Sequence, residues 1–289
     1  MPPAQLGLIN GFAGMLIFSA SLPATRLAVL EFDPLFLTMA RASIAALCAA
    51  LWIGYVRAPR PARGDLGRLV VVALGVVVGF PLLTALALQQ VTAMRGMVFI
   101  GLLPLATALA GMLHGGERPR PAYWLFSSLG AVLVGGFALA SGGGDGGLQG
   151  DLLLLAAVLV CGVGYAEGAV LSRRLGGVQV ISWALLLALP AMLPLAILLR
   201  PDSVAGIGTP GWLGLAYVSL FSMFVGFVFW YRGLAQGGIA AVSQIQLLQP
   251  FCGMALAAML LGETLDWPVL AVAAGVAGCV AGARRFARR

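Results

Sequence analysis

Long apolar runs fill almost the whole sequence, separated by short breaks at proline, glycine or charged residues. An α-helix needs about 20 predominantly apolar residues to cross the hydrocarbon core of a bilayer. The breaks leave ten runs near that length: residues 5–30, 34–56, 66–88, 92–114, 121–140, 148–172, 178–199, 211–234, 239–262 and 266–283. The pattern therefore predicts an all-α integral membrane protein with ten transmembrane helices.

One apolar segment occurs twice, at an offset of 146 residues. Residues 97–117 read MVFIGLLPLATALAGMLHGGE, and residues 243–263 read SQIQLLQPFCGMALAAMLLGE. Without a gap, Pro104 aligns with Pro250, and both segments end in Gly-Glu. An internal repeat in a chain of membrane helices is typical of secondary transporters whose binding site lies between the halves.

The glycine-rich segment 141–150, which reads SGGGDGGLQG, divides five predicted helices from five others. We expect it to be a linker between a first repeat at residues 1–140 and a second repeat at residues 151–289. Because each half holds an odd number of helices, the second half enters the membrane from the opposite side. The sequence thus predicts two inverted five-helix repeats around a central cavity.

The arginines are distributed as this topology requires. All 17 basic residues are arginine, and cytoplasmic segments of membrane proteins are enriched in them. Only Arg26, Arg95 and Arg200 fall at outer ends when both termini are cytoplasmic, and Arg41 lies within the second span. The other arginines fall in cytoplasmic segments: Arg57, Arg60, Arg63, Arg68, Arg118, Arg120, Arg173, Arg174, Arg232, Arg284, Arg285, Arg288 and Arg289. We expect a multi-pass protein of the bacterial inner membrane with both termini in the cytoplasm.

Composition agrees with a lipid environment. The chain is 61% hydrophobic and 9% charged, with a mean hydropathy of +1.02, whereas about a quarter of the residues in a soluble domain are charged. The formal net charge of +7 is explained by membrane topology, and we expect no binding of nucleic acid.

Several chemistries are excluded by the residue types that are missing. The chain has one histidine, four scattered cysteines and no lysine. These residues provide no metal site, no disulfide framework and no phosphate loop for ATP-driven transport, so we expect neither a metal nor a cofactor. An intramembrane enzyme would also need a nucleophile with its base or a pair of carboxylates, and the sequence predicts that the protein is not an enzyme.

The sequence resembles the drug/metabolite transporter superfamily, in its EamA-type branch of ten-helix exporters. The resemblance covers nearly the whole chain, and within the branch it is nearest to exporters of aromatic amino acids of the YddG type. It implies a central cavity lined mainly by the first, third, fourth, sixth, eighth and ninth spans. The residues that carry it are the repeated helix with its proline and terminal glutamate, and a short-residue join in each half: Pro104, Glu117, Pro250, Glu263, Ala87, Leu88, Gly233 and Leu234.

The two copies of the repeated helix differ in polarity. Ser243, Gln246 and Gln249 fall on one helical face, while the positions aligned with the first two are Met97 and Ile100. Uncharged hydrogen-bonding groups suit the carboxylate and ammonium of a zwitterion, and thioether and aliphatic groups suit a variable apolar side chain. We therefore predict a substrate cavity between them; the alternative is that the amides join neighbouring helices.

Aromatic residues inside the predicted spans are further candidates for substrate contacts. Phe80, Phe99, Tyr165 and Trp230 lie within spans, and Thr84 is the residue that aligns with Trp230 in the repeat. A buried tyrosine or tryptophan needs a polar partner, which a hydrated cavity supplies. Packing in the core or contact with lipid is the alternative for each.

Two charged residues and three prolines within the spans are candidate gate or hinge positions. Arg41 and Glu167 are costly in a bilayer and are functional by default. The alternatives are that Arg41 extends outward to an acidic loop and that Glu167 pairs with an arginine two helical turns away. Pro23, Pro104 and Pro250 are expected to bend their helices, either as hinges or as packing kinks.

These features together predict a secondary transporter that exports small amphiphilic metabolites by alternating access. Amino acids with aromatic or hydrophobic side chains are the expected substrates, and a broad drug or metabolite efflux carrier is the alternative. The lack of a second deep acid favours facilitative export without proton coupling. We expect a functional monomer whose partners are the substrate and the lipid bilayer.

Overall fold

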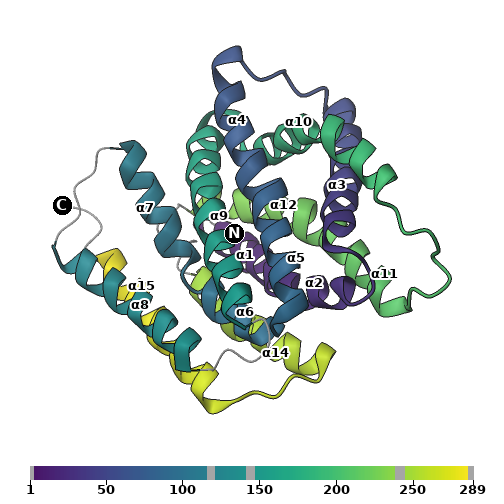
Figure 1. The fold of residues 1–289 in the computed structure, drawn as a ribbon. Coiled ribbons are helices and arrows are strands. Elements are labelled where there is room, and N and C mark those ends of the chain that lie inside the picture. Colours follow the sequence, from purple (N-terminus) through teal and green to yellow (C-terminus); the bar gives the residue numbers. More distant parts are fainter. Residues whose placement is uncertain (1–2, 116–120, 141–146, 238–244, 286–289) are drawn as a thin grey trace.

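The computed structural model of the protein describes residues 3–115, 121–140, 147–237 and 245–285, and these form a bundle of helices without strands (Figure 1). Seven stretches are long and apolar enough to cross a membrane: Gln5–Val29, Pro34–Val56, Arg63–Gln90, Ala93–Gly111, Gly147–Leu175, Gly177–Leu198 and Thr209–Gly233. Shorter apolar helices fall within the remaining three predicted spans: Trp124–Phe137, Gln246–Leu261 and Trp267–Gly282. The expected all-helical membrane protein is confirmed at this level.

Several predicted spans consist of more than one helical segment. The segments before the linker are α1 (Pro3–Ser19), α2 (Ser21–Val29), α3 (Pro34–Val56), η1 (Arg63–Asp65), α4 (Leu66–Val72), η2 (Ala73–Gly79), α5 (Phe80–Gln90), α6 (Ala93–Ile100), α7 (Leu103–Gly115) and α8 (Pro121–Ala140). Those after it are α9 (Gly147–Leu175), α10 (Gly177–Leu198), α11 (Thr209–Ala216), η3 (Tyr217–Val225), α12 (Gly226–Gly237), η4 (Gln246–Leu248), α14 (Gln249–Leu261) and α15 (Trp267–Arg285).

Prolines account for three of the breaks. A proline removes the hydrogen bond to the carbonyl four residues earlier and its ring collides with that carbonyl. Pro23 stands four residues after Ser19, where α1 ends, and Pro104 stands four residues after Ile100, where α6 ends. Pro250 lies in the first turn of α14, preceded by the 3₁₀ turn η4. The two repeated prolines therefore begin new helical segments, whereas the sequence predicted continuous helices with a missing bond in the middle.

Two segments are π-helical. They are η2 and η3, and their last residues, Gly79 and Val225, are separated by the same 146 residues as the repeated prolines. Short π-helical stretches are rare and often occur at functional sites. Pro81 follows η2 closely, whereas no proline follows η3 within the span, so the proline alone does not explain both.

Helices from the two parts of the sequence pack against one another. α1 packs along α12, α9 along α5 and η2, α3 along α10, and α8 along α15 at one edge of the bundle (Figure 1). Small residues permit the closest approaches, as is common between membrane helices. A Cβ atom on Gly233 would lie 2.6 Å from the backbone nitrogen of Gly11, and one on Gly75 would lie 2.6 Å from the carbonyl oxygen of Val160. Each part of the chain thus helps to bury helices of the other.

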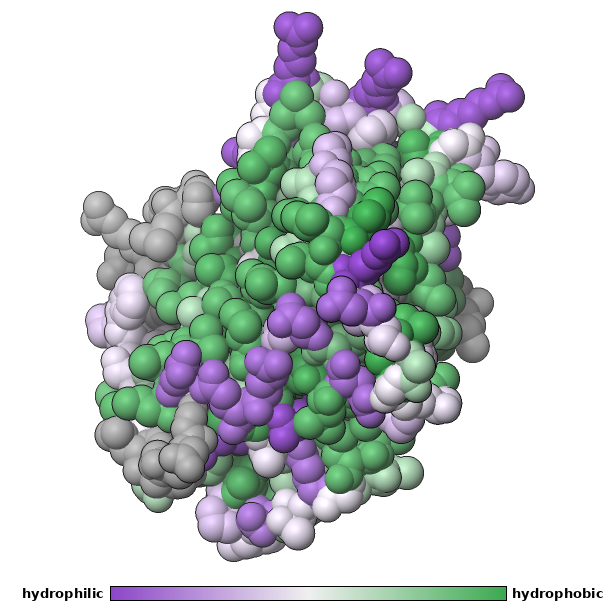
Figure 2. Space-filling view, turned by 45° about the vertical axis from the view of Figure 1, so that its right-hand side comes forward, coloured by the Kyte–Doolittle hydropathy of each residue, from purple (hydrophilic) through white to green (hydrophobic). Residues whose placement is uncertain are grey.

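Large apolar side chains cover much of the outer surface. In Figure 2 hydrophobic residues cover much of the upper part of the visible face, beneath hydrophilic side chains at its top, and further hydrophilic residues form a band across its lower half. Many large apolar side chains are exposed, and Leu51 and Leu198 are 75% and 77% exposed. Water-soluble proteins rarely expose large contiguous apolar surfaces. The bilayer is the environment that makes these exposures favourable.

Candidate functional site

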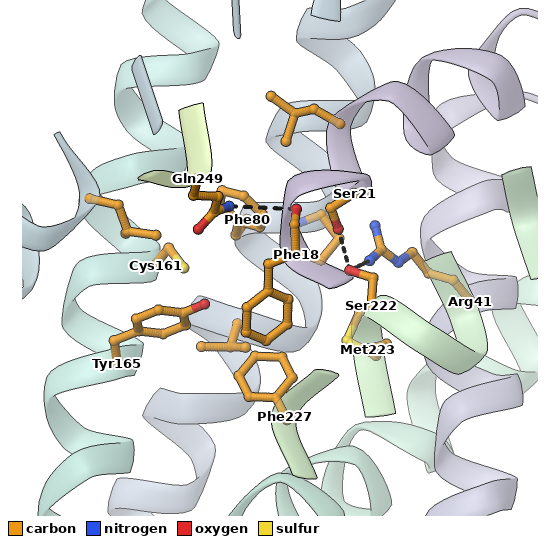
Figure 3. A pocket seen from close by; sticks show the side chains of 14 residues that line it. Phe18, Ser21, Arg41, Phe80, Cys161, Tyr165, Ser222, Met223, Phe227 and Gln249 are labelled. Atoms are coloured by element: carbon orange, nitrogen blue, oxygen red, sulfur yellow. Dashed lines mark hydrogen bonds between the residues drawn. The ribbon is translucent and has the colours of Figure 1, made fainter. Parts of the chain in front are cut away.

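A small cavity lies at the centre of the bundle, where the breaks and π-helical segments converge (Figure 3). Its volume is about 30 Å³, which is room for roughly two water molecules. The residues around it come from segments on both sides of the linker: Phe18, Ser21, Leu22, Arg41, Val76, Phe80, Pro81, Leu103, Cys161, Tyr165, Ser222, Met223, Phe227 and Gln249.

One wall of the cavity is polar and carries a charge. The hydroxyls of Ser21 in α2 and Ser222 in η3 hydrogen-bond to each other, and Nη2 of Arg41 in α3 donates to Ser222 Oγ at 3.4 Å (Figure 3). Arg41 is only 4% exposed, and its Nε has no hydrogen-bond partner among the described residues. No carboxylate in the described part of the chain forms a salt bridge with this guanidinium.

A buried amide forms part of the opposite side. Gln249 is the first residue of α14, and its Nε2 makes a long contact of 3.5 Å to the carbonyl oxygen of Phe18 near the end of α1. Its Oε1 is buried without a hydrogen-bond partner among the described residues. A buried acceptor of this kind is costly to leave unpaired, and it is available to a donor that enters the cavity.

Aromatic rings enclose the rest of the cavity. Phe18 and Phe227 meet edge to face with their centroids 5.0 Å apart, and Tyr165 meets Phe227 edge to face at 6.1 Å. Phe80 lines the same space from the start of α5 (Figure 3). Such pairs are a favourable arrangement for rings, and they leave ring faces and edges available to an apolar ligand.

The structure brings some of the predicted site residues to this cavity and places others elsewhere. Phe80, Tyr165, Gln249 and Arg41 line it. The others that the structure describes are buried outside its lining: Met97, Ile100, Phe99, Thr84, Trp230, Gln246, Pro23, Pro104, Pro250 and Glu167. Ser243 lies outside the described residues, so its predicted place beside Gln249 stays a prediction.

Physical reasons for these displacements are local. Met97 packs against Gly253 of α14, where a Cβ atom would lie 2.3 Å from the methionine Cε, so it fills a helix contact. The Thr84 hydroxyl donates to the carbonyl oxygen of Phe80 at 2.7 Å, which is the usual behaviour of threonine inside a helix. Gln246 lies in the 3₁₀ turn η4, one turn before Gln249, and is buried there without lining the cavity.

Ten lining residues were not among the sequence candidates: Phe18, Ser21, Leu22, Val76, Pro81, Leu103, Cys161, Ser222, Met223 and Phe227. Ser21 follows the break that Pro23 causes, and this was the one signal in the sequence that could have identified it. Ser222 lies in η3, whose π-helical geometry the apolar sequence does not reveal. The only sign of Ser222 in the sequence was its polarity within an apolar span.

Charge pairs connect helices at the arginine-rich end of the bundle. Glu167 of α9 lies 3.6 Å from Nε of Arg68 in α4, and Arg174 pairs with Asp65 at the start of α4. The sequence suggested instead that Glu167 pairs with Arg174. Because α4 packs against α9, each of these pairs joins charges across the helix contact.

The Arg41 side chain does not extend outward to an acidic loop, which was the alternative considered from the sequence. Asp33, one of the two acids expected to attract it, caps α3 by accepting from the backbone N–H groups of Leu35 and Phe36. Glu31, the other, accepts from the backbone N–H of Gly208 at 3.4 Å. Arg41 turns inward to Ser222 instead.

The opposite end of the bundle is held by a second set of contacts. Arg95 pairs with Asp151 at 2.6 Å, and the carboxylate of Glu263 accepts from the backbone N–H groups of Ala93 and Met94 at 2.9 and 2.7 Å. Arg26 donates to the carbonyl oxygen of Leu88 at the end of α5. A wide groove of about 980 Å³ opens beside these contacts, between α8 and the loop before α15.

In the part of the chain that is described, no cluster of histidine, cysteine, aspartate or glutamate has the composition of a metal site. The cavity is lined by a guanidinium and two hydroxyls on one side, an amide on the opposite side, and aromatic rings around the rest. This set can bind a small molecule with both polar and apolar parts.

Comparisons with known proteins identify a family. The model of the EamA-like transporter family matches residues 5–139 and again residues 148–283. An uncharacterized transporter of Bacillus subtilis (strain 168), YdeK, is 64% identical over 282 residues that cover 98% of each chain. A probable terminal-alkyne amino-acid exporter of Streptantibioticus cattleyicolor is 25% identical over 277 residues, covering 94% of this chain and 90% of that one.

A known crystal structure superposes on the chain with a TM-score of 0.65 at 19% sequence identity, covering 98% of this chain and 99% of the other, and this likeness concerns the fold alone. The family and the relatives indicate a transporter and not an enzyme. Because the two matches to the family model span nearly all of the sequence, the protein belongs to the EamA-like transporter family of the drug/metabolite transporter superfamily.

Proposed function

We propose that the protein is a secondary transporter that exports small amphiphilic metabolites, with amino acids that carry hydrophobic or aromatic side chains as its substrates. The observation that carries this proposal is the division of the central cavity. Arg41, Ser222 and Gln249 present polar groups, and Phe80 and Tyr165 present aromatic surface, around one cavity. A molecule with a polar end and an apolar side chain matches both walls.

Two inverted five-helix halves, at residues 1–140 and 151–289, form the proposed architecture. The family model matches once in each half, and the offset of 146 residues recurs in the structure. It separates the first residues of α7 and α14, Leu103 and Gln249, and the last residues of η2 and η3. Equivalent breaks at equivalent places support a repeat, and the odd number of spans in each half supports inversion.

Alternating access is the proposed mechanism. The cavity of about 30 Å³ is too small for an amino acid with an aromatic side chain, since ligand pockets commonly hold about 300 Å³ or more. Substrate entry therefore requires helices to separate at one end of the bundle. The two ends carry different contacts, Arg68–Glu167 at one and Arg95–Asp151 at the other, so each end has its own set to open or close.

The proposed orientation places the arginine-rich end and both termini in the cytoplasm of a bacterium. The segregation of arginines along the sequence supports this orientation. Arg68, Arg173 and Arg174 all lie at the end of the bundle that holds the Arg68–Glu167 contact. Export then runs from this end towards the end that carries Glu263.

The amino-acid substrate class has support from one distant relative, the probable terminal-alkyne amino-acid exporter. A carrier of cationic drugs is disfavoured, because the buried guanidinium of Arg41 would repel a positive ligand in a medium of low dielectric constant. Aromatic selectivity of the kind that the sequence resemblance implied is consistent with the four rings of the cavity and stays part of the proposal.

Counterflow in proteoliposomes tests this function. Purified protein is reconstituted, the vesicles are loaded with one unlabelled amino acid at a time, and uptake of the labelled compound is followed. We expect accumulation with phenylalanine, leucine and similar amino acids, and little with lysine or glutamate. Cys161→Phe should abolish accumulation by filling the cavity, whereas Leu51→Phe on the lipid-facing surface should leave it unchanged. Failure of every amino acid to exceed protein-free vesicles would refute the proposal.

A further inference from the structure

Arg41 is the feature of the cavity that packing does not explain. A cation inside a membrane-spanning bundle is costly unless it is paired or hydrated, and such residues commonly mark a substrate or ion pathway. Arg41 is 4% exposed, and its only described hydrogen bond is the 3.4 Å contact with the neutral Ser222. This distance exceeds the usual range for N–H···O hydrogen bonds, so the contact is a weak anchor.

A second buried group faces the same cavity with unused hydrogen-bonding capacity. Gln249 Oε1 has no hydrogen-bond partner in the described part of the chain, just as Arg41 Nε has none. In Figure 3 the two side chains lie on either side of the Ser21 and Phe18 positions, and both line the cavity. One is a charged donor and the other is a neutral acceptor.

We propose, on the basis of the function proposed above, that Arg41 binds the carboxylate of the substrate and that Gln249 accepts from its ammonium group. The planar guanidinium can give two parallel N–H groups to a carboxylate. The Ser222 hydroxyl, held in place by Ser21, donates a third hydrogen bond to the same carboxylate. The side chain of the substrate then lies among Phe18, Phe80 and Phe227.

This arrangement makes the carboxylate the essential part of the substrate. In the described structure Arg41 has no carboxylate partner. A bound carboxylate would pair with the buried guanidinium and so offset the cost of burying its charge. An amine without a carboxylate would leave Arg41 unpaired and add a second positive charge beside it. A site built around a buried charged group rejects ligands that cannot pair with it. The ammonium contributes less, because its partner is a neutral amide oxygen.

The first arm of the test compares ligands that differ only in these two groups. Phenylalanine, 3-phenylpropionate and phenethylamine are added to the detergent-solubilised protein, and the thermal unfolding midpoint is followed with concentration. We expect phenylalanine to bind most tightly, 3-phenylpropionate next, and phenethylamine at least about tenfold more weakly than 3-phenylpropionate. The same order is expected when the three compounds compete with labelled phenylalanine in counterflow.

Variants assign the two groups to their residues. Arg41→Gln should remove the preference for 3-phenylpropionate over phenethylamine, and Arg41→Lys should restore part of it. Gln249→Leu should reduce the preference for phenylalanine over 3-phenylpropionate and leave carboxylate selectivity intact. Arg60 is exposed and does not line the cavity, so Arg60→Gln is the matched control. This variant should bind all three compounds as the parent does.

The outcomes separate this inference from the function on which it rests. Carboxylate-selective binding without any amino-acid counterflow would overturn the transport function and leave the role of Arg41 standing. Equal stabilisation by 3-phenylpropionate and phenethylamine, stabilisation by neither, or unchanged selectivity in folded Arg41→Gln would each overturn the inference.

Discussion

Two buried glutamines three residues apart show how position decides the role of the same side chain. Gln246 and Gln249 are 6% and 5% exposed, yet only Gln249 lines the cavity. The break before Pro250 places Gln246 in η4 and Gln249 at the start of α14. Sequence periodicity predicted that both line the cavity, and the structure brings only Gln249 to it.

Gln249→Leu and Gln246→Leu therefore form a matched pair. We expect Gln249→Leu to weaken counterflow of amino acids by about five- to tenfold, since one hydrogen bond to the substrate is lost. Gln246→Leu should change it by less than about twofold. The measurement is the apparent KM for counterflow at equal protein incorporation. Equal losses in the two variants would show that these amides act through helix packing.

Glu167 allows a prediction about energy coupling. Its carboxylate is buried beside Arg68 at the arginine-rich end, away from the residues of the central cavity. A proton-coupled carrier needs an acid that senses the substrate, and Glu167 does not touch the cavity. We expect uptake into proteoliposomes to be nearly independent of an imposed pH gradient in both the parent and Glu167→Gln. A strong dependence that disappears in Glu167→Gln would make this carboxylate the proton site.

Side chains of the cavity could be predicted only where chemistry marked them. Arg41 and Gln249 were detectable because charged and amide groups are unusual in apolar spans, and Phe80 and Tyr165 because aromatic residues lay away from the span ends. Ser21 and Ser222 meet across the bundle through the contact of α2 with η3. No local pattern in the sequence encodes which two helices will approach each other.

At the scale of elements, the broken helices are joined end to end by one carboxylate. Glu263 follows α14 and accepts from two N–H groups at the first turn of α6, where the helix dipole favours a negative charge. The terminal glutamate of the repeated segment thus connects the end of α14, which contains Pro250, to α6, the segment that precedes Pro104. This contact belongs to the end of the bundle opposite the Arg68–Glu167 contact.

Glu263→Gln should destabilise the protein through this cap. Loss of the charge at a helix N-terminus and of one charge-assisted hydrogen bond is worth about 1–2 kcal/mol. We expect a lower thermal unfolding midpoint in detergent for Glu263→Gln and no change for Asp202→Asn, an exposed acid in a loop. An unchanged midpoint for Glu263→Gln would mean that the cap contributes nothing to the stability of this state.

The breaks and the π-helical segments mark the limit of prediction for elements. Prolines at 23, 104 and 250 indicated where helices would bend, but not that each would restart as a new segment. The segment η3 contains no proline, so its sequence did not indicate π-helical geometry. This segment packs against α3, a contact that the sequence of one helix does not reveal.

For the whole molecule, hydrophobic run length predicted the spans because the bilayer imposes one length on every crossing. Seven predicted spans recur as long apolar helices and three contain shorter ones. The contacts between the two parts of the chain, such as α1 with α12 and α9 with α5, were not predictable from the runs. An apolar run predicts that a helix is surrounded by lipid or protein, but it does not indicate which helix is its neighbour.

Orientation in the membrane is testable at exposed positions. In a variant with Cys48, Cys161, Cys252 and Cys279 replaced, we expect a single cysteine at Asp202 to react with a membrane-impermeant maleimide added to intact cells. A cysteine at Arg60 should react only after the membrane is opened. Both positions are exposed, so access to the reagent depends on the side of the membrane alone. Labelling of position 60 in intact cells would reverse the topology.

The most direct test of the whole account is counterflow of labelled phenylalanine in liposomes that contain only this protein, with the parent and Cys161→Phe measured side by side. The account predicts transient accumulation in vesicles loaded with unlabelled phenylalanine, no dependence on added ATP, and loss of accumulation when the cavity is filled. Accumulation that is absent in the parent, or that persists in folded Cys161→Phe, would contradict a carrier that moves amino acids through the central cavity.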